Sequence, residues 1–150
     1  ASRIAECYPD LDTTGHYRER ALTLYEISEQ VKNWGDTVAK EICNGTHGGY
    51  LQDINQLVDR FIRDMSLPRD NPQLSELYEQ PGNRMNDVRA VVMTSAYLAN
   101  LRGEIPKGNT RNWIFSVAIN APSSIPYCEA ALNRAVEPLT RTVLKMNWPD

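Results

Sequence analysis

Apolar residues recur at steps of three and four along four stretches of the chain, and this spacing places them on one face of an α-helix. The first two stretches run from about residue 16 to 43 and from about residue 50 to 65. The third begins after Asn83, which we expect to cap a helix, and reaches Ile105. The fourth begins near Pro126, a residue tolerated in the first turn of a helix. The pattern therefore predicts an all-α protein.

Each predicted helix has one face that we expect to be buried. The residues on these faces are Leu24, Ile27, Val31, Trp34, Val38 and Ile42; Leu51, Ile54, Leu57, Val58, Phe61, Ile62 and Met65; Met85, Val88, Val91, Val92, Ser95, Leu98, Ala99, Leu101 and Ile105; and Cys128, Ala131, Leu132, Ala135, Val136, Leu139 and Val143. Gly35 is expected to weaken the first helix, and Pro138 is expected to kink or divide the last one.

Glycine and proline mark the ends of the predicted helices. Asn44 and Gly45 should end the first, Pro68 the second, and Gly103 with Pro106 the third. Residues 1–15 contain several turn-forming residues without a sustained period, so we expect an extended leader that ends in a turn. Residues 16–150 then form a single helical bundle domain.

Two connecting segments carry weaker patterns. Residues 74–78 lie among three prolines and are expected to form a turn or two of helix. Residues 110–121 suit either a short helix or a strand, and we favour the short helix. Four main helices of this length predict a four-helix bundle with up-down-up-down order, although other helical packings stay open.

Composition agrees with a soluble globular protein of one domain. The chain has 150 residues, of which 41% are apolar and 23% are charged. Its uncharged apolar runs are shorter than the roughly 20 residues that cross a bilayer, so we expect at most peripheral contact with a membrane. Cys7, Cys43 and Cys128 lie far apart without zinc-site spacing, and we expect each to be a small buried residue. The cysteines leave the compartment open.

No set of catalytic or metal-binding residues can be recognised. His16 and His47 lie near opposite ends of the first predicted helix and belong to no paired ligand motif. Gly45, Gly48 and Gly49 are neither preceded by a strand nor followed by a Lys-Ser/Thr pair, so a phosphate-binding loop is not indicated. We therefore expect a non-enzymatic protein without a metal or a cofactor.

The charges are distributed unevenly along the chain. Residues 1–83 carry a net charge of −6, residues 84–111 carry +3, and residues 112–150 carry 0. The net charge of −3 makes nucleic acid a poor partner. A basic surface along the third helix and its exit could bind an acidic protein, and Trp148 is a candidate docking residue near the chain end. The candidate partner-binding residues are Arg84, Arg89, Arg102, Lys107, Arg111 and Trp148. An ordinary solvated surface is the alternative.

The same region carries a family resemblance. The run Asn86-Asp87-Val88-Arg89, Ala96-Tyr97-Leu98, Leu101-Arg102 and Ile105-Pro106-Lys107 resembles the PsbQ-type extrinsic proteins of photosystem II, including their red-algal and diatom forms. The resemblance implies a four-helix bundle in the thylakoid lumen, docked on the lumenal subunits of photosystem II. It also implies a role in retaining calcium and chloride for water oxidation, with Arg84, Arg89, Arg102 and Lys107 as docking contacts. Removal of a transit peptide before Ala1 would agree with this location, while a secreted or a cytoplasmic protein stays open.

Three functions are therefore considered. The first is an interaction subunit of a larger assembly, and photosystem II is the specific assembly that the resemblance implies. The second is a self-assembling helical structural protein, such as a rod-virus coat subunit. The third is a helical ligand-binding protein or an enzyme whose polar residues form a pocket between helices.

Overall fold

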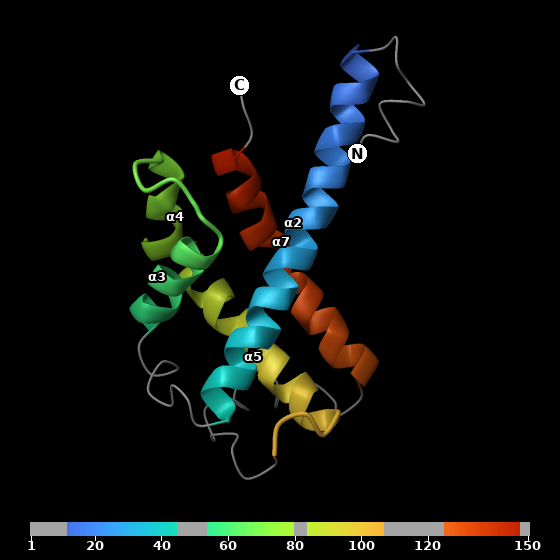
Figure 1. The fold of residues 1–150 in the computed structure, drawn as a ribbon, viewed down its shortest axis with the longest axis vertical. Helices are drawn as coiled ribbons and strands as arrows, with labels where there is room; N and C mark the ends of the chain where they lie inside the picture. Colours follow the sequence, from blue (N-terminus) through green and yellow to red (C-terminus); the bar gives the residue numbers. More distant parts are fainter. Residues whose placement is uncertain (1–11, 45–53, 80–83, 107–124, 148–150) are drawn as a thin grey trace.

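The structure is a computed structural model that describes residues 12–44, 54–79, 84–106 and 125–147 (Figure 1). Every regular element in these ranges is helical, which confirms the predicted all-α class. The elements are α2 (Asp12–Cys43), α3 (Ile54–Asp64), the 3₁₀ helix η2 (Pro72–Leu74), α4 (Ser75–Tyr78), α5 (Met85–Leu101) and α7 (Ile125–Asn147). The predicted element at residues 110–121 lies outside the described residues.

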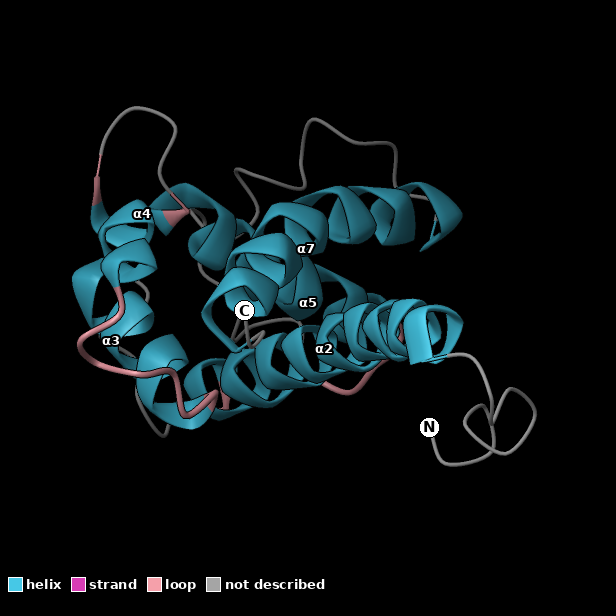
Figure 2. Ribbon diagram, turned by 90° about the horizontal axis from the view of Figure 1, so that it is seen from above, coloured by secondary structure: helices cyan, strands magenta, loops and turns pink. Residues whose placement is uncertain are grey.

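The three longest helices, α2, α5 and α7, pack against one another. The short helices α3 and α4 lie together on one side of this group, where both contact α5 (Figure 2). α7 runs in the opposite direction to α2, and the N-terminal end of α2 extends beyond the other helices (Figure 1).

Buried side chains from each of these α-helices form one connected hydrophobic core. Phe61, Leu57, Leu77 and Leu139 are among its largest members, and each is at most 1% exposed. Nearly all residues predicted for the four buried faces are buried or packed against this core, wherever their side chains are described. Cys43 and Cys128 are buried as predicted, and burial raises the pKa of the Cys128 thiol. Cys7 lies outside the described residues.

Two residues predicted to be buried are exposed instead: Leu24 and Leu101, each at 37%. Leu24 lies on the same face of α2 as the core residues, but it lines a groove between α2 and α7 and is left partly open to solvent. Leu101 is the last residue of α5 and lies about 120° around the helix from the centre of the buried face. Helical spacing locates a face, but it does not show where the packing partners of that face end.

The predicted end of α5 is confirmed at Gly103. This residue has a φ of 78°, in the left-handed region that glycine adopts without strain. The Gly103 amide donates to the carbonyl of Asn100 at 3.1 Å, and the Glu104 amide donates to that of Ala99 at 2.8 Å. These two bonds form a Schellman motif, which pairs the last carbonyls of the helix.

α3 ends with the same motif, but with a serine in the left-handed position. Ser66 has a φ of 56° and lies two residues before Pro68, the predicted stop. Its amide donates to Arg63 at 3.1 Å, and the Leu67 amide donates to Ile62 at 3.0 Å. Ile62 and Leu67 are both buried, which supplies the apolar contact that accompanies this motif.

Several predicted boundaries are wrong. α2 begins at Asp12, so residues 12–15 belong to the helix rather than to the predicted leader. Gly15 does not prevent this, since glycine costs only about 1 kcal/mol in a helix relative to alanine. The N-cap of α5 is Arg84 rather than Asn83, and its side chain makes no capping bond. α7 continues across Pro138, so of the two outcomes expected there the division is wrong, while the kink stays a prediction.

Gly35 has a packing role that its low helix propensity does not reveal. A Cβ atom at this position would lie 2.5 Å from Val91 Cγ1 and 3.0 Å from Ser95 Oγ, both on α5. Such distances are well below van der Waals contact. The absence of a side chain at Gly35 is therefore what lets α2 and α5 approach so closely.

Candidate interaction surface

Of the basic residues predicted from the sequence, the three that the structure describes, Arg84, Arg89 and Arg102, do not form one patch. Arg84 precedes the first residue of α5 and Arg102 follows the last, so the length of the helix, roughly 26 Å, separates them. Arg84 pairs with Asp87 at 3.1 Å. Arg89 lies between these ends and is half-buried. Lys107, Arg111 and Trp148 lie outside the described residues.

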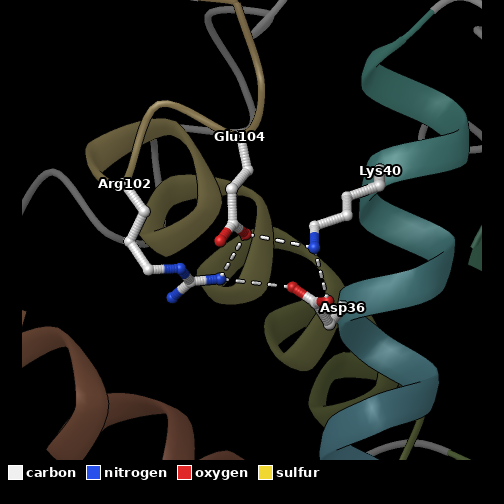
Figure 3. Close-up of polar contacts among 4 residues, drawn as sticks. All are labelled: Asp36, Lys40, Arg102 and Glu104. Carbon is white, nitrogen blue, oxygen red and sulfur yellow. Dashed lines mark hydrogen bonds and ion pairs between the residues drawn. The ribbon is translucent and has the colours of Figure 1, made fainter.

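Arg102 belongs to a network of four charged residues that joins α2 to the end of α5 (Figure 3). Its Nη2 atom lies 3.0 Å from Glu104 Oε1 and 3.4 Å from Asp36 Oδ1. Lys40 Nζ lies 3.0 Å from Asp36 Oδ2 and 3.1 Å from Glu104 Oε1. Two cations and two anions therefore balance one another, and the charge of Arg102 is already compensated within the chain.

This network also shifts the pKa values of Glu104 and Lys40. Hydrogen bonds from Arg102 and then from Lys40 lower the pKa of Glu104 from 4.5 to about 2. Hydrogen bonds to Asp36 and Glu104 raise the pKa of Lys40. Glu104 and Lys40 therefore stay charged near neutral pH. Their geometry indicates a link between two helices more than a docking site.

A different basic surface lies on the outer face of α7. Arg134, Glu137, Arg141 and Lys145 follow one another at steps of three and four, within roughly 80° of the helix circumference. Their face is opposite the core residues Val136, Leu139 and Val143. We call this stripe of four charged residues the α7 surface.

Two grooves border the α7 surface, and they share Glu137 and Arg141. The larger, of about 630 Å³, is lined by all four residues of the stripe together with Arg84, Pro138, Thr142 and Leu144. The smaller, of about 310 Å³, lies between α7 and α2, where Leu24, Ser28 and Lys32 face Asn133 and Thr140. Among the sequence-predicted residues that the structure describes, Arg84 is thus the one that lies beside the α7 surface.

The cations of the α7 surface are held weakly or not at all. Arg141 pairs with Glu137 at 3.2 Å, but both side chains are about two-thirds exposed. Lys145 reaches Glu76 only at 3.8 Å. Arg134 is exposed and makes no ion pair with any residue in the described part of the chain. Exposed pairs contribute about 0–1 kcal/mol each, so a partner carboxylate could replace the internal ones.

The sequence contained a signal for this surface. Arg134, Arg141 and Lys145 are all of the basic residues after position 112, and they occur at helical spacing. Summing the charges of residues 112–150 gives zero, because three acidic residues cancel them. Mapping the charges onto the faces of the predicted helix reveals the stripe, whereas the net charge of the whole segment does not.

A further groove, of about 490 Å³, lies beside Trp34 between α2 and the end of α3. The Trp34 indole donates to Asp64 Oδ2 at 3.0 Å and packs against Phe61 in a T-shaped arrangement, with ring centroids 4.9 Å apart. Arg60 donates to the same oxygen of Asp64 at 3.1 Å and reaches Glu41 at 2.7 Å. Trp34 is 7% exposed, which confirms its predicted place in the core. These bonds explain Asp64, the charged residue of the groove, as a structural contact.

Within the described ranges, no group of three or more His, Cys, Asp or Glu side chains could hold a metal ion. His47 lies outside those ranges. Among the helices that the structure describes, none is long and apolar enough to cross a bilayer. Comparison of the chain with protein-family models, curated proteins and solved structures finds no match. The function must therefore be argued from the surface itself.

Proposed function

We propose that this protein is a non-catalytic, helical interaction subunit that docks on a larger assembly through its α7 surface. The observation that carries this proposal is the stripe of exposed cations on α7, bordered by two grooves. Arg134 has no ion-pair partner among the described residues, and Arg141 and Lys145 have only exposed or distant ones. A partner that supplies carboxylates would gain ion pairs without first breaking strong ones.

The predicted consequence is binding that depends on salt. Ion pairs at an exposed surface weaken as the Debye length falls from about 30 Å at 0.01 M salt to about 3 Å at 1 M. Steering of the partner toward the cations should weaken in parallel, which lowers the association rate. An apolar interface would instead change little under the same conditions.

Photosystem II is the specific assembly that we propose as the partner. The resemblance of residues 86–107 to PsbQ-type extrinsic proteins supports this choice, and a location in the thylakoid lumen belongs to it. In that setting the protein would help to retain calcium and chloride for water oxidation. We further propose that α2, α3, α5 and α7 form one four-helix bundle in up-down-up-down order, as in that family.

The experiment mixes the purified chain with salt-washed photosystem II particles at low and at high salt. Co-sedimentation measures binding, and oxygen evolution at limiting calcium and chloride measures function. The proposal predicts binding at low salt, release at high salt, and recovered oxygen evolution. Absence of binding to particles from several algal lineages would refute photosystem II as the partner.

A second candidate function is self-assembly, and exposed apolar residues on α2 favour it. Leu24 is 37% exposed and Tyr25 is 65% exposed, and both lie in the N-terminal half of α2. A second copy could cover this part of the helix. Light scattering over a range of protein concentrations tests the idea, and a monomer at every concentration would exclude it.

A further inference from the structure

We infer that the segment received by the α7 surface is an acidic amphipathic helix of a partner protein. The inference rests on the proposed docking function and adds the chemistry of the partner. It is argued from the spacing of the cations on α7, from the position of Glu137 between them, and from the apolar residues in the bordering grooves.

The cations are spaced as a helical partner requires. Arg134 and Arg141 are seven residues apart and Arg141 and Lys145 are four apart, which along a helix corresponds to about 10 Å and about 6 Å. A second helix lying alongside α7 presents carboxylates at the same spacing when its acidic residues are also seven and four positions apart. Each cation can then face one carboxylate.

Glu137 makes the surface selective for a partner with separate, individually placed charges. Its carboxylate lies on the stripe between Arg134 and Arg141, and it is 65% exposed. A polyanion with evenly repeated charge, such as a nucleic acid or an anionic membrane, must place negative charge opposite Glu137. The net charge of −3 on the whole chain adds to that repulsion. A protein helix can instead present a neutral or basic residue there.

The grooves supply the apolar part of the contact. Pro138 and Leu144 line the larger groove and Leu24 lines the smaller one, on either side of the shared Glu137 and Arg141. An amphipathic helix places apolar residues next to its acidic stripe, where they could enter these grooves. Charge would then fix the register of the partner, and the apolar side chains would hold it in place.

The test uses a synthetic fluorescent peptide of about 18 residues, long enough to cover the stripe with roughly one extra turn at each end. It is designed to be helical, with glutamates seven and four positions apart, lysine opposite Glu137, and leucines beside the glutamates. Fluorescence anisotropy at low salt measures its affinity for the complete chain. We expect saturable binding that is lost at high salt and lost when the peptide glutamates are replaced by glutamine.

Matched variants locate the binding. Arg134→Glu should lower the affinity for the peptide by about tenfold, because it replaces an attraction by a repulsion at an exposed site. Arg69→Glu makes the same charge change at an exposed arginine that lines a separate groove with Asp59 and Tyr78, so it should change affinity less than twofold. Glu137→Ala should reduce the preference for the lysine-bearing peptide over an otherwise identical alanine-bearing one.

Three results would overturn the inference: no peptide binding at low salt, equal losses for Arg134→Glu and Arg69→Glu, or tighter binding to duplex DNA or phosphatidylglycerol vesicles than to the peptide. These results are separable from the photosystem proposal. If the peptide binds in a way that depends on Arg134 but the chain does not bind to photosystem II particles, the inference is sustained and photosystem II is refuted as the partner. If the chain binds to the particles, if Arg134→Glu abolishes that binding, and if the peptide does not bind, the docking surface is sustained and the acidic helix is refuted.

Discussion

Replacing Gly35 by alanine should destabilise the protein, although alanine is the better helix former. Helix propensity alone predicts a gain of about 1 kcal/mol in the free energy of unfolding. The new Cβ atom, however, would lie 2.5 Å from Val91 Cγ1, about 1 Å inside normal contact. Val91 is fully buried and β-branched, so it cannot easily rotate away. Overpacking of this kind costs about 1–3 kcal/mol, and we expect a net loss of about 1 kcal/mol.

Urea unfolding followed by circular dichroism at 222 nm measures this change. The midpoint should fall while the slope stays constant, because the same surface is exposed on unfolding. Val91→Ala removes the clashing methyl group, so it should rescue Gly35→Ala in part. The double-mutant cycle should give a favourable coupling energy of about 1 kcal/mol.

A raised midpoint for Gly35→Ala would refute this reasoning, since it would mean that propensity outweighs packing at the contact between α2 and α5. Additive effects of Gly35→Ala and Val91→Ala would also contradict it. In that case the destabilisation would not arise from the contact between these two residues.

Three further predictions follow from single residues. Ser66→Gly should raise the free energy of unfolding by about 0.5–1 kcal/mol, because glycine adopts the left-handed conformation without strain; urea unfolding measures it. Burial, and then the hydrogen bond to Asp59, raise the pKa of Tyr78 from 10.0 to about 12. The protonated Tyr78 hydroxyl therefore contributes fully to stability below pH 10, and this contribution is lost between pH 10 and 12. Tyr78→Phe should flatten the decline of the urea midpoint in that window. Glu104 has its pKa lowered to about 2, so its contribution is present above pH 4.5 and is lost as the pH falls to 2. Glu104→Gln should lower the urea midpoint at pH 6, and the difference from the wild type should vanish near pH 2.

Arg102, a docking residue predicted from the sequence, is a poor choice for a substitution that tests docking. Arg102→Glu would place a third carboxylate beside Asp36 and Glu104, in a network that joins two helices. Lost binding could then reflect a disturbed fold. Arg134→Glu avoids this problem, because within the described ranges Arg134 belongs to no ion pair. Its circular-dichroism spectrum should match that of the wild type.

Sequence periodicity was sufficient to predict the helical class and most of the buried faces. The 3.6-residue repeat determines which side of a helix is apolar, so residues such as Val31, Val88 and Leu139 could be assigned to the core from their spacing. Local stop signals were equally informative, since Gly103 adopts the conformation that only glycine takes without strain. These features depend on near neighbours along the chain.

Features that depend on distant neighbours could not be predicted. Nothing within a few residues of Gly35 indicates that Val91 lies against it, so glycine appeared only as a weak helix former. Arg102 appeared available for a partner because its contact with Asp36 spans 66 positions of sequence. The α7 surface could have been found by mapping charge on a helical wheel, although the grooves that border it depend on α2 and on Arg84.

The central claim is that the cations of the α7 surface dock this protein on its partner. The most direct measurement compares the wild type, Arg134→Glu and Arg69→Glu in co-sedimentation with salt-washed photosystem II particles at low salt. We predict that the wild type and Arg69→Glu sediment with the particles to the same extent, while Arg134→Glu sediments much less at the same concentration, with an unchanged helical spectrum. Equal sedimentation of all three proteins would contradict the claim and place any docking site elsewhere on the molecule.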